Sequence, residues 1–237
     1  MLHNVLPIQP SIMPRTATVI RVMIASPGDV ASERQIAKQV IHDWNDIHSL
    51  DRGTVLLPIS WDTHASPAMG DRAQAIINKQ ILSDADILIA IFWARIGTHT
   101  GVAACGMVEE ITEHIAAGKP TMLYFSTAPV RQDSVDDDQF KSLRLFKETV
   151  RNQNNGLYEE YESLSEFKEK LTRQLAQTII RGYPSQPPKS SSPNDGSNRL
   201  PDPPSASKVD ASPSRPFSSP GGLMERFNAS LQRDRKS

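Results

Sequence analysis

Residues 84–93 read DADILIAIFW, a short run of apolar and mostly branched side chains behind two aspartates. A strand with one face in solvent alternates polar and apolar residues, whereas an unbroken apolar run is typical of a strand buried on both faces. We therefore expect Asp86–Trp93 to be the central strand of a parallel sheet. Asp84 and Asp86 mark the start of that strand, where we interpret them as caps.

Outward from this run, apolar segments alternate with amphipathic ones. Strands are expected at 18–25, 54–60, 120–125 and 157–161, and helices at 30–47, 71–82, 107–117, 139–152 and 165–180. Asp29 is the expected N-cap of the first helix and Ser165 that of the last. Pro58 assigns the second strand to a sheet edge or to a strand end. The alternation predicts an α/β fold with a mostly parallel sheet of about five strands between two helical layers.

The composition divides the chain near Pro184. The 54 residues from 184 onward hold 10 Pro, 13 Ser and 3 Gly, too few apolar side chains to offset the entropy of ordering the chain. We expect a flexible N-terminal arm over 1–16, one α/β domain over 17–182 and a disordered Pro/Ser-rich tail over 183–237. Within the tail, Gly222–Leu231 (GLMERFNASL) is apolar enough to form a short helix on a partner, although a frayed polar end is favoured.

Several classes of protein are excluded by counts alone. The chain has 26 Lys and Arg against 27 Asp and Glu, a formal net charge of −1, so it does not bind nucleic acid through bulk positive charge. Its single cysteine, Cys105, excludes a disulfide framework, and the spacing of the histidines predicts no metal site. No apolar run is long enough to span a membrane, and the N-terminus lacks the pattern of a secretory signal, so we expect a cytoplasmic protein.

Three stretches together resemble a known family: IASPGDVASERQIAKQVI (24–41), DADILIAIFWARIGTHTGVAACGMVEEI (84–111) and HIAAGKPTMLYFS (114–126). They are similar to a bacterial family of domains of unknown function, the DUF4062 type, which is grouped with the TIR-like domains. The resemblance covers about Val19–Ile180 and implies a flavodoxin-like, TIR-like three-layer sandwich. Bacterial TIR-like domains often serve in signalling and defence, so the resemblance also implies a role in antiphage immunity.

The resemblance carries over one catalytic position. TIR-like domains are distantly similar to nucleoside 2-deoxyribosyltransferases, and both use a glutamate near a ribosyl carbon on the helix after the third strand. The transferases show G-x-x-x-E and then GKP eight residues after the glutamate. Gly106 and Glu110 have the first spacing and Gly118-Lys119-Pro120 has the second, so the resemblance implies Glu110, rather than Glu109, as the catalytic residue.

Two positions depart from these patterns. Ala104 stands where the transferases have an aspartate, and Gly106-Met107 stands where typical TIR domains have Trp-Cys. These departures motivate a second hypothesis, a module that binds a nucleotide or associates with itself without turning anything over. A third hypothesis is a scaffold whose Pro/Ser-rich tail tethers the domain to partner proteins.

The candidate site follows from the topology of a parallel sheet, in which ligands bind beyond the carboxyl ends of the strands. Cleavage of an N-glycosidic bond develops positive charge at the ribosyl carbon, which a carboxylate such as Glu110 would stabilise or trap. The other candidates lie in loops at the same edge of the sheet. They are Ser26 and the Gly28 amide for a phosphate or ribose hydroxyl, Trp61 or Trp93 for stacking on a base, Arg95 for a diphosphate, and Gly106 at the helix start.

Each candidate also has a structural alternative. The alternatives are a solvated helix carboxylate for Glu110, an ordinary turn for Ser26–Gly28, core packing for Trp93 and half of an ion pair for Arg95. The favoured function is cleavage of the N-glycosidic bond of NAD or a related nucleotide, with NAD as substrate and no cofactor or metal. The expected partners are this nucleotide and a second copy of the chain or another protein.

Overall fold

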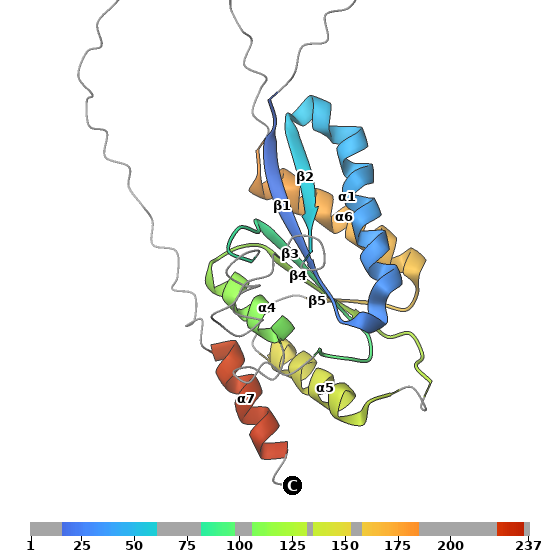
Figure 1. Ribbon diagram of the computed structural model, residues 1–237, viewed down its shortest axis with the longest axis vertical. Coiled ribbons are helices and arrows are strands. Elements are labelled where there is room, and N and C mark those ends of the chain that lie inside the picture. The colour runs from blue at the N-terminus through green and yellow to red at the C-terminus, as the bar shows by residue number, and fades with distance from the viewer. Residues whose placement is uncertain are drawn as a thin grey trace, which may run out of the picture.

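The fold is described by a computed structural model over residues 16–60, 82–97, 106–131, 135–152, 158–184 and 222–234. These residues form a five-stranded sheet in the order β2-β1-β3-β4-β5, and every neighbouring pair of strands is parallel (Figure 1). The strands are β1 (Thr18–Ala25), β2 (Thr54–Ile59), β3 (Ile87–Phe92), β4 (Thr121–Ser126) and β5 (Tyr158–Tyr161). The parallel sheet predicted from the alternating segments is thereby confirmed.

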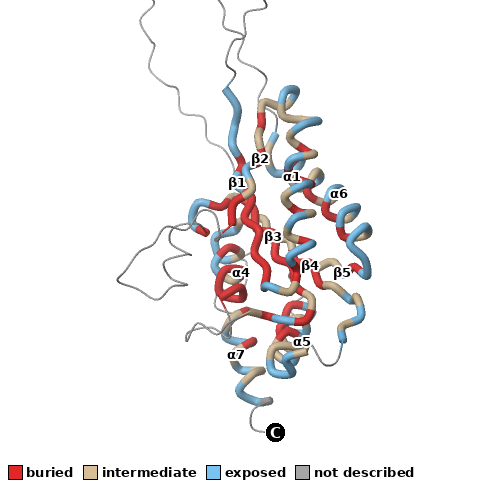
Figure 2. Tube along the Cα trace, turned by 45° about the vertical axis from the view of Figure 1, so that its right-hand side comes forward, coloured by how far each residue is buried: buried red, intermediate tan, exposed pale blue. Residues whose placement is uncertain are grey.

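Helices cover both faces of this sheet, as Figure 2 shows. One face packs against α1 and α6, and the other packs against α4, α5 and α7. Their bounds are α1 (Ala31–Arg52), α4 (Gly106–Ala116), α5 (Asp137–Asn152), α6 (Leu164–Gly182) and α7 (Gly222–Asp234), and a single 3₁₀ turn, η1 (Gly28–Val30), precedes α1. The three-layer sandwich is therefore confirmed. The predicted helix 71–82 lies outside the described residues except for Leu82.

The core has two halves because side chains alternate across each strand. In β1, Ile20, Val22 and Ile24 face α1 and α6, whereas Met23 and Ala25 face the other helical layer. All six residues of β3 are buried, as an unbroken apolar run in a central strand requires. β2 and β5 are the two edges of the sheet, which agrees with the positions expected from Pro58 and from the shortness of 157–161.

The strand order places a topological switch point between β1 and β3. From β1 the chain first moves outward to β2 and then returns past β1 to form β3 on its other side. The connections leaving the carboxyl ends of β1 and β3 therefore diverge, and ligands of open α/β sheets bind in the crevice between such connections. This geometry locates the candidate site at the carboxyl edge of β1 and β3.

Two helix caps differ from the prediction. Asp29 does not cap α1, because η1 delays the start of the helix to Ala31 and leaves Val30 as an N-cap without a side-chain hydrogen bond. Ser163, and not Ser165, caps α6, since its Oγ accepts a hydrogen bond from the Glu166 amide at 3.3 Å. In each case the helix begins within two residues of the expected position, but another residue lies at its N-terminus.

The opposite, amino edge of the sheet is held by polar contacts that are structural. Asp86 accepts a hydrogen bond from the Arg21 amide at 2.7 Å, and Asp84 forms an ion pair of 2.8 Å with the Arg21 guanidinium. Lys119 of the GKP sequence donates to the backbone carbonyls of Ser83 and Ala85 at 2.8 and 2.7 Å. Lys119 thus stabilises residues 83–85, which precede β3.

The end of the tail is ordered on the domain itself. Gly222–Asp234 forms α7, which packs beside α4 and α5 (Figure 1). Its Leu223 and Phe227 are 7% and 0% exposed and belong to the core on this face. The Phe227 ring makes an edge-to-face contact of 5.5 Å with Phe146. The favoured prediction of a frayed polar end is therefore wrong for this segment, and the helix docks on its own chain. No helix in the described part of the chain has the length and apolarity needed to cross a membrane.

We predict that His114 makes the fold sensitive to acid. This α4 residue is 1% exposed, its Nδ1 lies 3.0 Å from the Thr121 hydroxyl, and burial, with a smaller effect of the Lys119 charge, lowers its pKa from 6.5 to about 4. Between pH 6.5 and about pH 4, His114 is therefore protonated in the unfolded chain but mostly neutral in the folded chain. Lowering the pH from 7 to 5 should therefore reduce the free energy of unfolding by about 2 kcal/mol through this group.

Urea unfolding of the wild type and of His114→Asn at pH 7 and pH 5 measures this effect. Asparagine can keep the hydrogen bond to Thr121 but does not titrate in this range, so the variant should lose stability less steeply on acidification. Equal losses in the two proteins would contradict the prediction.

Candidate functional site

The turn after β1 is fixed by an arginine from the first turns of α1. Arg34 Nε donates to the Ser26 hydroxyl at 2.8 Å, and its Nη2 donates to the Pro27 carbonyl at 3.0 Å. Ser26 is buried, whereas Gly28 is exposed and has open space where a side chain would be. The Ser26 hydroxyl therefore already accepts a hydrogen bond from the protein, and Gly28 forms the accessible rim of the turn.

Asp29 connects this turn to the end of β3. One carboxylate oxygen, Oδ2, accepts hydrogen bonds from the amides of Ala94 and Arg95 at 3.0 and 3.1 Å. Its other oxygen, Oδ1, is sealed from solvent and has no hydrogen-bond partner in the described part of the protein. Asp29 thus ties the two sides of the switch point together, which is a different role from the helix cap that the sequence predicted.

The residues after β3 are held from the other side by α5. Gln139 Oε1 accepts hydrogen bonds from the amides of Ile96 and Gly97 at 3.2 and 3.0 Å. Gly97 has a φ of 112°, a conformation that favours glycine. With the two bonds to Asp29, four successive amides from 94 to 97 are satisfied by side chains of the protein. These amides are consequently occupied, and a phosphate would have to displace an existing acceptor to bind them.

Trp93 and Arg95 flank this segment differently. The Trp93 indole N–H donates to the Ala128 carbonyl at 2.9 Å, and its half-buried ring packs against the core beneath α1 and α6. The Arg95 side chain is exposed. The indole is thus oriented by the protein, and its structural role is observed, while Arg95 is the accessible cation of this rim. Trp61 lies outside the described residues.

Two buried polar residues that the sequence analysis did not single out lie at the same edge. The Tyr161 hydroxyl at the end of β5 donates to Glu33 Oε1 in α1 at 3.3 Å, and the two residues are 1% and 8% exposed. Burial is the main cause that raises the pKa of Tyr161, and the negative charges of Glu33 and Asp29 raise it further. Both carboxylates therefore approach the same phenol.

One sequence signal could have indicated this cluster. Glu33 follows Asp29 by four residues within SPGDVASER, the spacing that brings side chains to one side of a helical turn, but Tyr161 is distant in sequence and only the sheet brings it close.

Glu110 lies on the opposite face of the sheet, in α4. It is 5% exposed and follows Met107 by three residues and precedes His114 by four, so it shares the helical stripe of these two buried side chains. His114 contacts Thr121 at the amino end of β4, so Gly106 marks the end of α4 nearer the carboxyl edge. Glu110 is about 6 Å from Gly106 along the helix axis, and helical side chains lean toward the N-terminus. Glu110 therefore lies in the half of α4 that is nearer the carboxyl edge.

Glu109 differs from its neighbour in its stripe. It is also 5% exposed, but residues 112, 113 and 116 on its side of the helix are half-buried or exposed. Helical spacing thus distinguishes two adjacent glutamates of equal exposure, and it selects Glu110 as the one on the sheet-facing stripe.

The predicted site residues form two groups. Ser26, Gly28, Trp93 and Arg95 gather around the ends of β1 and β3, whereas Gly106 and Glu110 lie on the α4 face. Residues 94–97 run between the groups, and Ile96 packs into the core on the α4 side. A ligand that touches both groups must extend across this segment, as a molecule made of two linked nucleotides can.

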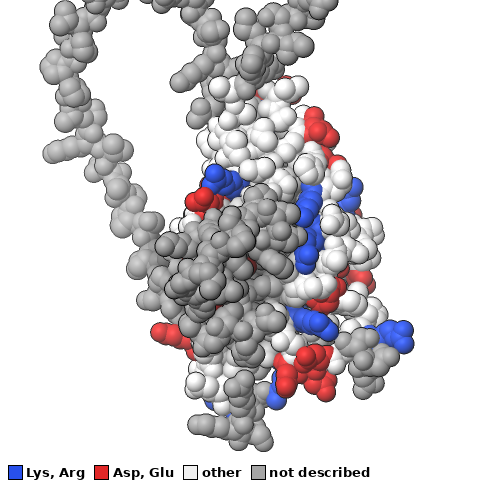
Figure 3. All heavy atoms as spheres, in the orientation of Figure 1, with Lys and Arg blue, Asp and Glu red and all other residues white. Residues whose placement is uncertain are grey.

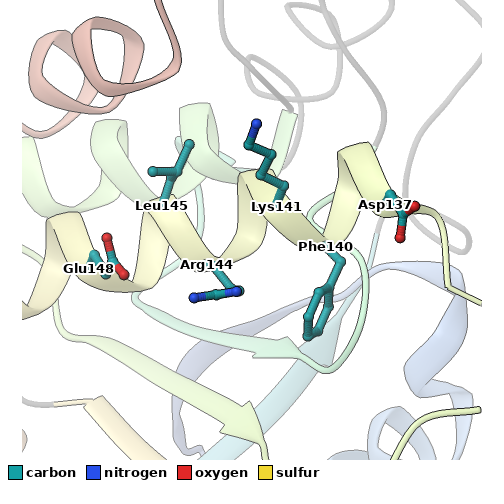
Figure 4. A pocket seen from close by; sticks show the side chains of 6 residues that line it. All are labelled: Asp137, Phe140, Lys141, Arg144, Leu145 and Glu148. Carbon is teal, nitrogen blue, oxygen red and sulfur yellow. The ribbon is translucent and has the colours of Figure 1, made fainter. Parts of the chain in front are cut away.

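A separate hollow of about 400 Å³ lies along α5 (Figure 4). Lys141 and Leu145 point to one side of the helix, and Phe140 and Arg144 point to the other. Asp137 and Glu148 complete a lining of mixed charge. None of the predicted site residues is among these six. Basic and acidic side chains are likewise interspersed on the described surface seen in Figure 3.

The profile of one family matches most of the folded chain. It is described as "Domain of unknown function (DUF4062)" and matches residues 21–176. The chain belongs to this family. The match begins within β1 and ends within α6, so it includes four complete strands and most of β1. No curated protein matches the DUF4062 chain.

Solved structures with similar coordinates are distant. A conserved protein from Enterococcus faecalis V583 has 14% identity and a TM-score of 0.31, with 66% of this chain and 99% of that chain covered. Translation elongation factor SelB from Methanococcus maripaludis has 11% identity and a TM-score of 0.39, with 69% and 37% covered. The flavodiiron protein from Giardia intestinalis has 8% identity and a TM-score of 0.35, with 70% and 37% covered. The alignment thus spans little more than a third of the latter two chains, and similarity at this level carries no functional argument.

Proposed function

We propose that this DUF4062 domain cleaves the N-glycosidic bond of NAD or a related nucleotide, and that Glu110 is the catalytic carboxylate. The observation that supports this most is the position of Glu110, buried in α4 one turn after the start of the helix and on the same stripe as Met107 and His114. The similarity to TIR-like domains and to nucleoside 2-deoxyribosyltransferases is part of the proposal, as is a role in bacterial signalling or defence.

The reaction requires little more than a well-placed carboxylate. The bond between the ribosyl carbon and the base nitrogen breaks, its electron pair leaves with the base, and positive charge develops on the ribosyl carbon. The Glu110 carboxylate stabilises that charge or bonds to the carbon as an ester. Water then attacks the carbon and loses a proton, any ester bond to Glu110 breaks to regenerate the carboxylate, and the free ribosyl product is formed. A positively charged leaving group, as in the nicotinamide half of NAD, departs as a neutral base and so needs no acid.

The rim residues would hold the rest of the substrate. Arg95, exposed beside the amides that Asp29 holds, would pair with a diphosphate. The oriented Trp93 ring would stack on a base. Asp29 directly follows Gly28 and its carboxylate repels a phosphate, so of the two ligands expected at Ser26 and Gly28 we propose the ribose hydroxyl.

Chromatography of NAD after incubation with concentrated full-length protein tests the activity. We expect release of nicotinamide and formation of ADP-ribose in proportion to protein concentration and time. Absence of base release from NAD and from a panel of nucleotides, with the protein tested also as an assembled oligomer, would contradict the enzymatic proposal.

A nucleotide-binding module without turnover is the second candidate. It is motivated by the departures from the catalytic patterns of the resembling families at Ala104 and Met107. A calorimetric screen of nucleotides that detects binding without base release would support this function, and a screen that detects neither binding nor self-association would exclude it.

A further inference from the structure

We propose that two copies of this chain associate by exchanging α7, so that the surface of α4 and α5 under α7 binds the same helix of the second copy. We call this surface the α7 seat. A seat that fits the helix of one copy also fits the identical helix of another copy. No step of this exchange uses the candidate catalytic or binding residues, so it is independent of the proposed function.

The attachment of α7 to the domain is apolar. Leu223 and Phe227 are buried, and Leu231 packs against the same core. The ring centroids of Phe227 and Phe146 of α5 are 5.5 Å apart. Between the described residues of α7 and those of α4 and α5 there is no hydrogen bond or ion pair, and Arg233 donates to a carbonyl of α7 itself. Apolar burial is not directional, so these contacts do not require the helix and the seat to belong to one chain.

The seat is fixed to the sheet by contacts that do not involve α7. Its larger part is α5. The Phe146 ring of α5 packs on Phe92 of β3 and Phe125 of β4, with ring centroids 5.6 and 6.4 Å apart. Lys147 of α5 forms an ion pair of 2.8 Å with Glu160 of β5. We therefore expect the seat to keep its shape when α7 leaves it.

The family match separates α7 from the domain that supplies the seat. It covers residues 21–176 and so includes α4 and α5, whereas α7 begins at Gly222. In both views of the fold α7 lies at the periphery of the domain (Figures 1 and 2). The part of the chain that defines the family thus contains the seat but not the helix that occupies it.

The length of chain before α7 permits exchange between copies. Residues 183–221 separate α6 from α7, and a segment of this length spans up to about 130 Å when fully extended, several times the roughly 30 Å diameter of a small domain. Reciprocal exchange buries the same surface in both copies and closes with two-fold symmetry. Protein concentration then sets the balance, because a tethered helix competes at an effective concentration of about 1 mM or less.

Binding of a labelled peptide of residues 222–234 to the full-length protein tests whether the seat accepts a helix that is not tethered to it. Phe227→Asp releases the protein's own α7, because a carboxylate is not buried without a partner, and it leaves the residues of the seat unchanged. We expect the peptide to bind this variant at least about ten-fold more tightly than the wild type, in which the tethered helix competes. Fluorescence anisotropy measures both affinities.

Ala229→Asp is the matched control, since it adds the same charge at an exposed position of α7. The peptide should bind this variant as weakly as it binds the wild type, and a peptide that carries Phe227→Asp should bind none of the three proteins. Equal affinities in all three proteins, or no binding to the Phe227→Asp protein, would overturn the proposal. So would unfolding of the Phe227→Asp protein, because exchange requires a seat that stays folded without its own helix.

Analytical ultracentrifugation of the same full-length proteins tests the exchange itself. The wild type and Ala229→Asp should form dimers as the protein concentration approaches about 1 mM, and Phe227→Asp should remain monomeric at the same concentrations. Dimers in all three proteins would place the contact between copies elsewhere. Peptide binding without dimers of the wild type would make α7 a cover of its own chain only, and either result would overturn the exchange.

Discussion

Replacing Glu110 by Gln is expected to slow base release from NAD by about 10³-fold, which corresponds to about 4 kcal/mol of transition-state stabilisation. The substitution keeps the size of the side chain, removes its negative charge and replaces one acceptor oxygen with an NH₂ donor. Charge matters here because the ribosyl carbon becomes positive as the base departs, so the neutral amide loses an interaction that is strongest in the transition state. The rate of nicotinamide release under single-turnover conditions measures the effect.

Glu109→Gln is a matched control for this experiment. Glu109 and Glu110 are adjacent, equally buried and in the same helix, so either substitution removes one negative charge from nearly the same place. Only Glu110 shares the sheet-facing stripe of Met107 and His114. We expect Glu109→Gln to retain activity within a few-fold. A greater loss in Glu109→Gln than in Glu110→Gln would contradict the assignment, and equal activity in the wild type and Glu110→Gln would indicate another residue or a contaminating enzyme.

The sheet could be predicted from the sequence because its signals are local. Each strand is a short apolar run, and the unbroken run at 87–92 already indicates the central position of β3. Helix ends were less predictable, since they depend on a choice among several polar residues in one turn. Ser163 and Ser165 are both suitable caps by residue type, but Ser163 has the extended backbone of an N-cap and accepts the hydrogen bond from the Glu166 amide.

The candidate site was predictable only in part, because its polar contacts are long-range. Asp29 looks like a helix cap in the sequence, but its hydrogen bonds cross to the segment after β3, 65 and 66 residues later. Tyr161 reads as an ordinary strand residue, although it donates to Glu33, 128 positions away. In the same way, the lysine of the GKP sequence supports the amino edge, so the resemblance that selects Glu110 includes a residue whose observed contacts are structural.

The docking of α7 was not predicted because the segment is embedded in a tail of unfavourable composition. The average composition of residues 184–237 is dominated by Pro and Ser. Within it, Leu223, Phe227 and Leu231 recur at every fourth residue, and this spacing places them on one apolar face of a helix. This apolar face packs against Phe146. The sequence predicts Phe146 on an amphipathic helix, but it does not show that α5 alone leaves the Phe146 side chain uncovered. Local periodicity was therefore the informative signal, and average composition was not.

Phe227→Ala is expected to lower the free energy of unfolding by about 3–4 kcal/mol. The Phe227 ring is fully buried and meets Phe146 edge to face at 5.5 Å, and Phe146 in turn contacts Phe92 of the central strand at 5.6 Å. Removing the ring leaves a cavity beside the core on the α4 and α5 face and also removes an aromatic contact. Arg226→Ala, at an exposed position of the same helix turn, should change stability by less than about 0.5 kcal/mol. Urea unfolding of both variants measures the difference.

The loss cannot exceed what the docking of α7 contributes, because a helix at the end of a long tail can leave the groove while the rest of the domain stays folded. Deleting residues 185–237 therefore sets the upper limit for Phe227→Ala. If the deletion and the substitution cost the same, the alanine variant has released α7, and proteolysis of the variant should remove the tail as fast as in an unfolded peptide. If the deletion costs more, α7 remains docked around the cavity. A Phe227→Ala variant as stable as the wild type would show that α7 does not pack on the domain in solution.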